Sequence, residues 1–173
     1  VNSIRETVTN NYDIFVVVGK PGDSATLNFV QREDILHNIH LINRGFPASI
    51  NDIYDYAWKY NNYDNLVIMG NDVIAYPYAI DSLINTAREK DYEWICSTQY
   101  DVRSLCAQFP ELKKYFVGNT YNFIDFSVKP WEVFTGYSKE EKVAEIGFSD
   151  VQNLCLYKRS VFDKIGYTDS NFF

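Results

Sequence analysis

Long apolar runs and an excess of positive charge are both missing from this sequence, and each absence excludes a class of protein. No stretch approaches the roughly 20 consecutive apolar residues that a membrane-spanning helix needs, so we expect a soluble protein with no transmembrane segment. The formal net charge of -7 argues against a broad basic face, and we therefore expect no nucleic-acid partner.

Cysteine is also scarce. The chain has three, Cys96, Cys106 and Cys155, and no two of them form a Cys-x-x-Cys motif. An odd and widely spaced set is typical of free thiols rather than of a disulfide framework. Because free thiols persist in a reducing compartment, we expect a cytoplasmic protein.

Aromatic residues, in contrast, are abundant, with 14 tyrosines and 12 phenylalanines. Such residues build hydrophobic cores, and they also build surfaces on which bases or sugar rings stack. Trp131, which follows Lys129 and Pro130, is a candidate for stacking on a sugar, and a place in the core explains it equally well.

The sequence up to about residue 100 alternates apolar segments with amphipathic ones. The continuously apolar run from Asp13 to Gly19 is typical of a strand buried on both faces. The clearest helix covers 48–61, where apolar residues recur at i, i+3, i+4, i+7 and i+8. This alternation predicts an α/β protein with a three-layer, mostly parallel sheet. The other predicted strands are 38–43, 65–70 and 92–98, and the other predicted helices are 3–8, 25–34 and 77–90, with Pro77 in the first turn of the last.

The alternation of apolar and amphipathic segments becomes less regular after Asp101. No repeat, low-complexity tract or linker interrupts the chain, so we interpret residues 1–173 as one domain. The predicted elements here are short helices within 100–116, strands around Pro130 within 121–134, a solvated helical turn at 138–142, a strand at 150–157 and a short helix at 160–166 ended by Gly166.

Sequence motifs follow one another along nearly the whole chain. They are the strand and turn Ile14 to Thr26, the segment Asn43 to Asn51 with its Asn-Arg-Gly start, the strand Leu66 to Val73 with Asn71-Asp72 near its end, and the segment Leu154 to Gly166 followed by Asp169 and Phe172-Phe173. In this order they resemble the GT-A glycosyltransferases, and within these the inverting family 2 that includes rhamnosyltransferase-like enzymes. The resemblance implies a GT-A-type domain that moves a sugar from a nucleotide-diphosphate donor to a glycan or other hydroxyl acceptor, with inversion at the anomeric carbon.

The resemblance also implies where the donor binds. Asp23 and Ser24 would contact the base or the ribose, and the segment Asn43 to Asn51 would lie near the nucleotide. Asp72 would face the diphosphate, directly or through Mg²⁺ or Mn²⁺, since these cations take one or two carboxylates together with phosphate oxygens. The residues assigned to the donor are Gly19, Asp23, Ser24, Asn43, Gly45, Asn51, Asn71 and Asp72, with Asp72 as the metal ligand.

The sequence departs from the family where the family has acids. Gly19 stands where an acid usually binds the nucleotide base, and Gly70 replaces the first acid of the metal motif. The catalytic base is usually part of an acid pair that would follow Phe173, which leaves Asp150 as a weak substitute within this sequence. We therefore expect a sequence cut at both ends, with a first strand missing before Val1.

Other interpretations remain open. Asp72 could cap a helix or close a turn, and Asn43, Gly45 and Asn51 are ordinary turn and cap residues. The missing acids favour a catalytically inactive GT-A-like binding or assembly module. A nucleotidyltransferase would share the α/β plan, but the segment 20–22 contains too little glycine to match the glycine-rich loop of that class.

Overall fold

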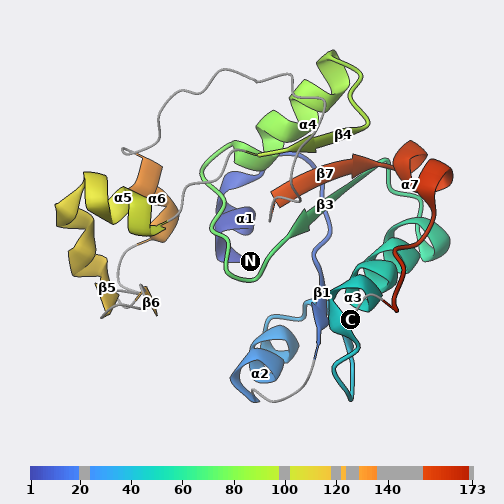
Figure 1. Ribbon diagram of the computed structural model, residues 1–173, viewed down its shortest axis with the longest axis horizontal. Coiled ribbons are helices and arrows are strands. Elements are labelled where there is room, and N and C mark those ends of the chain that lie inside the picture. The colour runs from blue at the N-terminus through green and yellow to red at the C-terminus, as the bar shows by residue number, and fades with distance from the viewer. Residues whose placement is uncertain (20–23, 98–101, 118–121, 124–128, 136–153, 172–173) are drawn as a thin grey trace. The chain divides into compact units, whose positions relative to one another are not determined.

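The computed structural model of the chain describes residues 1–19, 24–97, 102–117, 122–123, 129–135 and 154–171 (Figure 1). These residues form a mixed α/β structure that divides into two compact units. Unit 1 comprises Val1–Thr9 and Val67–Leu156, and unit 2 comprises Asn10–Leu66 and Tyr157–Phe173. Each unit therefore combines stretches that are far apart in the sequence, and the expectation of one domain over 1–173 stays a prediction.

Most of a three-stranded sheet, with the strand order β3–β7–β4, belongs to unit 1. Its strands are β3 (Asn65–Met69), β7 (Leu154–Lys158) and β4 (Trp94–Cys96), and the division between the units falls within β3 and β7. The central strand of the sheet thus comes from the C-terminal part of the chain. The short strands β5 (Phe116–Val117) and β6 (Asn122–Phe123) form a separate antiparallel pair.

The core of unit 1 joins one helix, α4 (Ala79–Glu89), to strand β7. Ile80, Leu83 and Ala87 recur at helical spacing on α4 and form its buried stripe. Leu154 and Leu156 alternate along β7 and are buried in the same cluster. The other helices that the structure describes in this unit are α1 (Asn2–Thr7), α5 (Val102–Gln108), the 3-10 helix η2 (Pro110–Tyr115) and α6 (Pro130–Thr135).

Unit 2 contains a parallel pair of strands, β1 (Phe15–Val18) and β2 (Leu36–Ile39), with α2 (Ser24–Arg32) between them in the sequence. Phe15 lies opposite Leu36 in this pair, so both side chains share one face. A helical crossover is the usual way to connect parallel strands, as the alternating sequence pattern predicts.

The longest helical segment of unit 2 changes its type part-way. Helix α3 (Gly45–Tyr54) continues directly into a π-helix, η1 (Asp55–Tyr60). The stripe predicted for 48–61 is confirmed, because Ile50, Tyr54, Ala57 and Trp58 are all buried. Helix α7 (Arg159–Ile165) packs an aromatic ring against this stripe, since the ring of Phe162 lies 5.3 Å from those of Tyr54 and Trp58.

Two of the predicted strands need correction. The run from Asp13 to Gly19 was expected to be buried on both faces, but within β1 only Val18 is buried. Strand β2 occupies 36–39 rather than 38–43, and Leu41 and Ile42 beyond its end are exposed. An apolar run can therefore continue past a strand into the turn that follows it.

Two prolines near helix starts, Pro77 and Pro130, lie elsewhere than predicted. Helix α4 begins at Ala79, after Tyr78 with its left-handed φ of +65°, so Pro77 precedes the helix instead of lying in its first turn. Pro130, which was expected among strands, begins helix α6. The backbone N–H of Glu132 donates to the Lys129 carbonyl at 3.0 Å, and proline suits the first helical position because its missing N–H has no partner there anyway.

The remaining predicted elements are confirmed or lie outside the described residues. Helices at the start of the chain and in 102–115, the strands β3, β4 and β7, and helix α7 with Gly166 after its end are all present. The predicted helical turn at 138–142 is outside the described residues. None of the helices in the described part of the chain is long and apolar enough to span a bilayer.

Candidate functional site

The carboxyl end of β3 displays an amide and a carboxylate. Strand β3 ends at Met69, and the chain then turns, with the Val73 N–H donating to the Gly70 carbonyl at 3.3 Å. Asn71 and Asp72 lie in this turn and are exposed. Asp72 forms no hydrogen bond or ion pair with any residue that the structure describes, and the residue that caps α4 is Tyr78, so Asp72 is not a helix cap. Its oxygens are therefore accessible to a ligand.

One carboxylate at this position fits a cation that is shared with a ligand. Among the described residues, no group of three or more histidines, cysteines or acids is placed to hold a metal ion. Mg²⁺ and Mn²⁺ do not need such a group when a bound diphosphate and water supply the other oxygens. The donor set at Asp72 thus fits a metal that binds together with a diphosphate, and it does not fit one that binds tightly alone.

The other described candidates for the donor lie in unit 2, whereas Asn71 and Asp72 belong to unit 1. Gly19 directly follows β1, and Ser24 is the exposed first residue of α2. The prediction that these residues serve one ligand stays a prediction. Asp23 and Asp150 lie outside the described residues.

The Asn-Arg-Gly sequence forms a turn that starts α3. The Asn43 side chain accepts a hydrogen bond from the Gly45 N–H at 3.0 Å, and Gly45 adopts a left-handed φ of +80°. Glycine takes this conformation without steric cost, and asparagine readily caps such a turn. The motif therefore has a local structural explanation, which holds whether or not a nucleotide binds beside it.

Both polar atoms of the Asn51 side chain form hydrogen bonds within the protein. Its Nδ2 donates to the Thr168 carbonyl at 2.9 Å, and its Oδ1 accepts from the Thr168 N–H at 2.9 Å and hydroxyl at 2.8 Å. The same hydroxyl lies 2.9 Å from the Pro47 carbonyl. This clasp attaches the residues after α7 to helix α3.

We expect Asn51→Ala to lower the free energy of unfolding by about 1–3 kcal/mol, because the Thr168 N–H would lose its acceptor and the Thr168 carbonyl its donor. Urea denaturation measures the change, and Asn28→Ala is the matched control because Asn28 is exposed on α2. Equal stability of the two variants would contradict the structural role of Asn51.

A second polar cluster, which sequence reasoning missed, surrounds Asp52. Its carboxylate accepts hydrogen bonds from the Asn38 amide at 2.7 Å and from the His40 ring Nε2, and Arg44 lies 3.7 Å away. His40 is 4% exposed, and its Nδ1 has no partner among the described residues. If Nε2 carries the proton that Asp52 accepts, Nδ1 is a bare acceptor. No motif could have revealed this cluster, because Asp52 and its partners meet only after folding.

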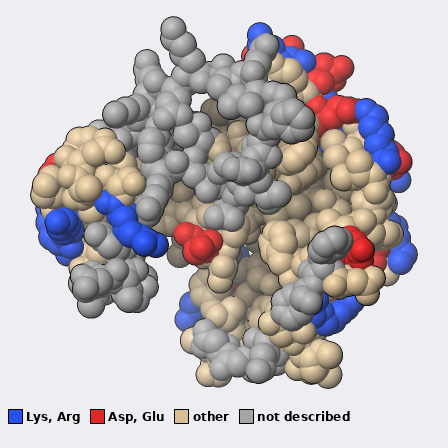
Figure 2. All heavy atoms as spheres, in the orientation of Figure 1, with Lys and Arg blue, Asp and Glu red and all other residues tan. Residues whose placement is uncertain are grey.

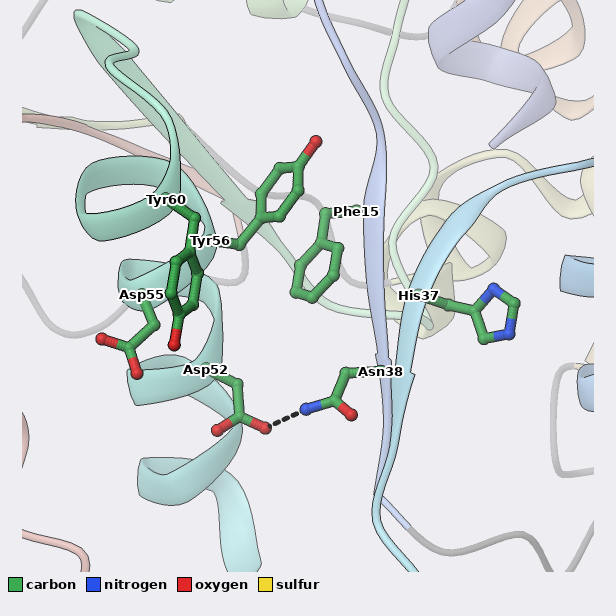
Figure 3. Close-up of a pocket in the computed structure, with 7 residues that line it drawn as sticks. All are labelled: Phe15, His37, Asn38, Asp52, Asp55, Tyr56 and Tyr60. Carbon is green, nitrogen blue, oxygen red and sulfur yellow. Dashed lines mark hydrogen bonds between the residues drawn. The ribbon is translucent and has the colours of Figure 1, made fainter.

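The same carboxylate borders an open pocket of about 360 Å³ between the β1–β2 pair and η1 (Figure 3). The rings of Phe15 and Tyr56 stack in parallel, 4.2 Å apart. Figure 3 shows Asn38 and Asp52 joined on one side of the strands, whereas the His37 ring points away. The residues that line the pocket are Phe15, His37, Asn38, Asp52, Asp55, Tyr56 and Tyr60.

The acids of this pocket already have partners. Asp55 lies 3.7 Å from Lys59 and accepts a hydrogen bond from the Tyr167 hydroxyl, which raises the pKa of Tyr167. Three lining residues belong to η1, and π-helical turns are frequent at functional sites. None of the described residues predicted for the donor lines this pocket, which offers ring faces and acceptor oxygens to a small polar molecule.

Comparison with protein-family models, with curated proteins and with solved structures found no match to this chain. Function must therefore be argued from the residues themselves.

Proposed function

We propose that the chain is a GT-A-type glycosyltransferase domain, which transfers a sugar from a nucleotide-diphosphate donor to a hydroxyl acceptor with inversion. The observation that carries the proposal is the exposed Asp72 carboxylate, which lies in the turn after β3 and has no partner in the described part of the chain. In open α/β sheets, ligands bind beyond the carboxyl ends of the strands. Asp72 is at such an end.

The chemistry of donor cleavage explains what Asp72 would do. When the sugar leaves, negative charge develops on the diphosphate, and a nearby cation stabilises it. Asp72 would hold Mg²⁺ or Mn²⁺ against the diphosphate oxygens, with Asn71 beside it as a hydrogen-bonding amide. The cation would supply charge neutralisation, and the protein would fix its position.

The α/β architecture of unit 2 also supports the proposal. The parallel β1–β2 pair and the crossover helix α2 are parts of the α/β plan that the resemblance implies. The proposal also includes the three-layer, mostly parallel sheet of the GT-A fold. It further includes a glycan as the acceptor and a cytoplasmic location for the protein.

The acceptor hydroxyl must lose a proton, and a carboxylate near it would serve as the base. Asp150 is the sequence's candidate, and it lies outside the described residues. We therefore assign no base to the described part of the chain.

A second candidate function is a GT-A-like module that binds without catalysing. It is favoured by Gly19 and Gly70, which stand where the resemblance calls for acids. It is also favoured by Asn51, whose side-chain nitrogen and oxygen both bond to Thr168. Such a module could keep the diphosphate contact at Asp72 and still lack turnover.

Calorimetry with uridine, thymidine and guanosine diphosphates tests the proposal. We expect at least one of them to bind about tenfold more tightly with Mn²⁺ than with a chelator, which corresponds to about 1.4 kcal/mol. Mn²⁺ alone should bind weakly, because Asp72 would supply the protein's one ligand. No binding by a correctly folded chain would overturn the assignment as a nucleotide-sugar enzyme.

A further inference from the structure

Two of the cysteines meet in the sheet of unit 1. Cys96 ends β4, and Cys155 lies in β7, the neighbouring strand. Their Sγ atoms are 2.7 Å apart, although 59 positions separate the residues in the sequence. Neither takes part in a disulfide bond. Two sulfur atoms at this distance are closer than an ordinary non-bonded contact allows.

We infer that Cys96 and Cys155 form an oxidant-sensitive dithiol, which a small-molecule disulfide such as oxidised glutathione converts into a cross-strand disulfide. Neighbouring strands lie about 4.8 Å apart. Disulfides bridge Cα atoms about 4.4–6.8 Å apart, so adjacent strands can hold the bond without large backbone movement. The thiols are thus already placed for the bond to form.

Their unequal exposure sets the order of the reaction. Cys96 is partly exposed, whereas Cys155 is 1% exposed. A large oxidant can therefore reach the Cys96 sulfur first, and Cys155 acts as the resolving thiol. Cys106 is buried elsewhere, in the cluster with Leu105 and Leu112, and burial raises the pKa of its thiol.

The chemistry balances in two exchange steps. The Cys96 thiolate attacks one sulfur of oxidised glutathione, so a mixed disulfide forms and one glutathione thiolate leaves. The Cys155 thiolate then attacks the Cys96 sulfur, which releases the second glutathione thiolate and leaves the Cys96–Cys155 bond. The protein loses two electrons and two protons, and these reduce one oxidised glutathione to two molecules of reduced glutathione.

The disulfide would link the central strand of the sheet, β7, to the edge strand β4. Strand β7 is held at present by backbone hydrogen bonds, such as Ser97 N–H to the Leu154 carbonyl at 3.0 Å, and by the buried leucines. Because 59 positions separate the two cysteines, a covalent link between them reduces the number of conformations open to the unfolded chain. The oxidised protein should therefore melt about 5–10 °C higher than the reduced one.

The experiment treats the folded chain with oxidised glutathione and maps its cysteines by alkylation and peptide mass spectrometry. We expect a Cys96–Cys155 peptide pair, no retained glutathione, and Cys106 as the one thiol that stays free. The melting temperature should rise and then return to its first value after reduction. A chain in which glutathione stays on Cys96 while Cys155 remains free would overturn the inference, as would no reaction at either.

Two variants distinguish the role of Cys155 from that of Cys106. In Cys155→Ser, glutathione should remain on Cys96 as a stable mixed disulfide, because the resolving thiol is gone. In Cys106→Ser, the Cys96–Cys155 link and the rise in melting temperature should be unchanged. If Cys155→Ser does not fold, the mapping on the unmodified chain decides, and a link that includes Cys106 would count against the proposed pair.

Discussion

Replacing Asp72 with asparagine is expected to abolish the Mn²⁺-dependent gain in affinity for a nucleotide diphosphate. Asparagine has nearly the same shape as aspartate but cannot offer an anionic oxygen to the cation. About tenfold of affinity should therefore be lost with Mn²⁺ present, and none when a chelator replaces the metal. Calorimetry of the same nucleotide with both proteins measures the difference.

Asp64→Asn is the matched control for this change. Asp64 is also exposed, and it precedes β3 by one residue, at the end of the strand opposite Asp72. Both substitutions remove one negative charge, so a general electrostatic effect would appear in both variants. A loss that is equal in the two variants would show that Asp72 has no specific contact with the metal or the diphosphate.

The second large effect is expected from Leu156→Ala. Leu156 is 0% exposed and lies in the central strand of the β3–β7–β4 sheet, within the core cluster of unit 1. Truncation removes buried methyl groups and leaves a cavity, so the free energy of unfolding should fall by about 2–5 kcal/mol. Urea denaturation would report this as a lower midpoint with an unchanged slope.

Ile165→Ala provides the comparison. Ile165 is the last residue of α7 and is 69% exposed, so its truncation should change stability by less than about 0.5 kcal/mol. If the two substitutions had similar effects, Leu156 would not be the core residue that its burial indicates.

Local patterns in the sequence predicted local structure well. The stripe at 48–61 identified the residues that α3 and η1 bury, because a helix brings its own near neighbours onto one face. The sequence could not reveal the change to a π-helix at Asp55, since both helix types bury a similar stripe. Pro130 was misplaced because proline begins helices as readily as it ends strands.

Contacts between distant residues could not be predicted in the same way. The turn at Asn71 and Asp72, in contrast, is local, because it comes at the end of an apolar strand that the sequence located correctly. The clasp between Asn51 and Thr168 depends on how the segment after α7 folds back. The Asp52 cluster likewise depends on the packing of α3 beside β2, and a single sequence carries no signal for it.

Figure 2 shows where charged side chains lie on one face, which the total charge of the chain does not reveal. The net charge of -7 describes the whole chain, yet on the visible face acidic and basic side chains of the described residues are interspersed. A charge total therefore supports only an expectation about broad classes of partner, whereas the placement of one acid, Asp72, bears on the particular ligand.

The strand order β3–β7–β4 has a consequence for synthesis on the ribosome. Strands β3 and β4 emerge first, but the strand that lies between them is not made until residues 154–158 have been added. Until then the nascent polypeptide holds two strand edges with unsatisfied backbone groups, which are prone to pair with other chains. Chaperones that shield such edges would act on this protein until residues 154–158 have been translated.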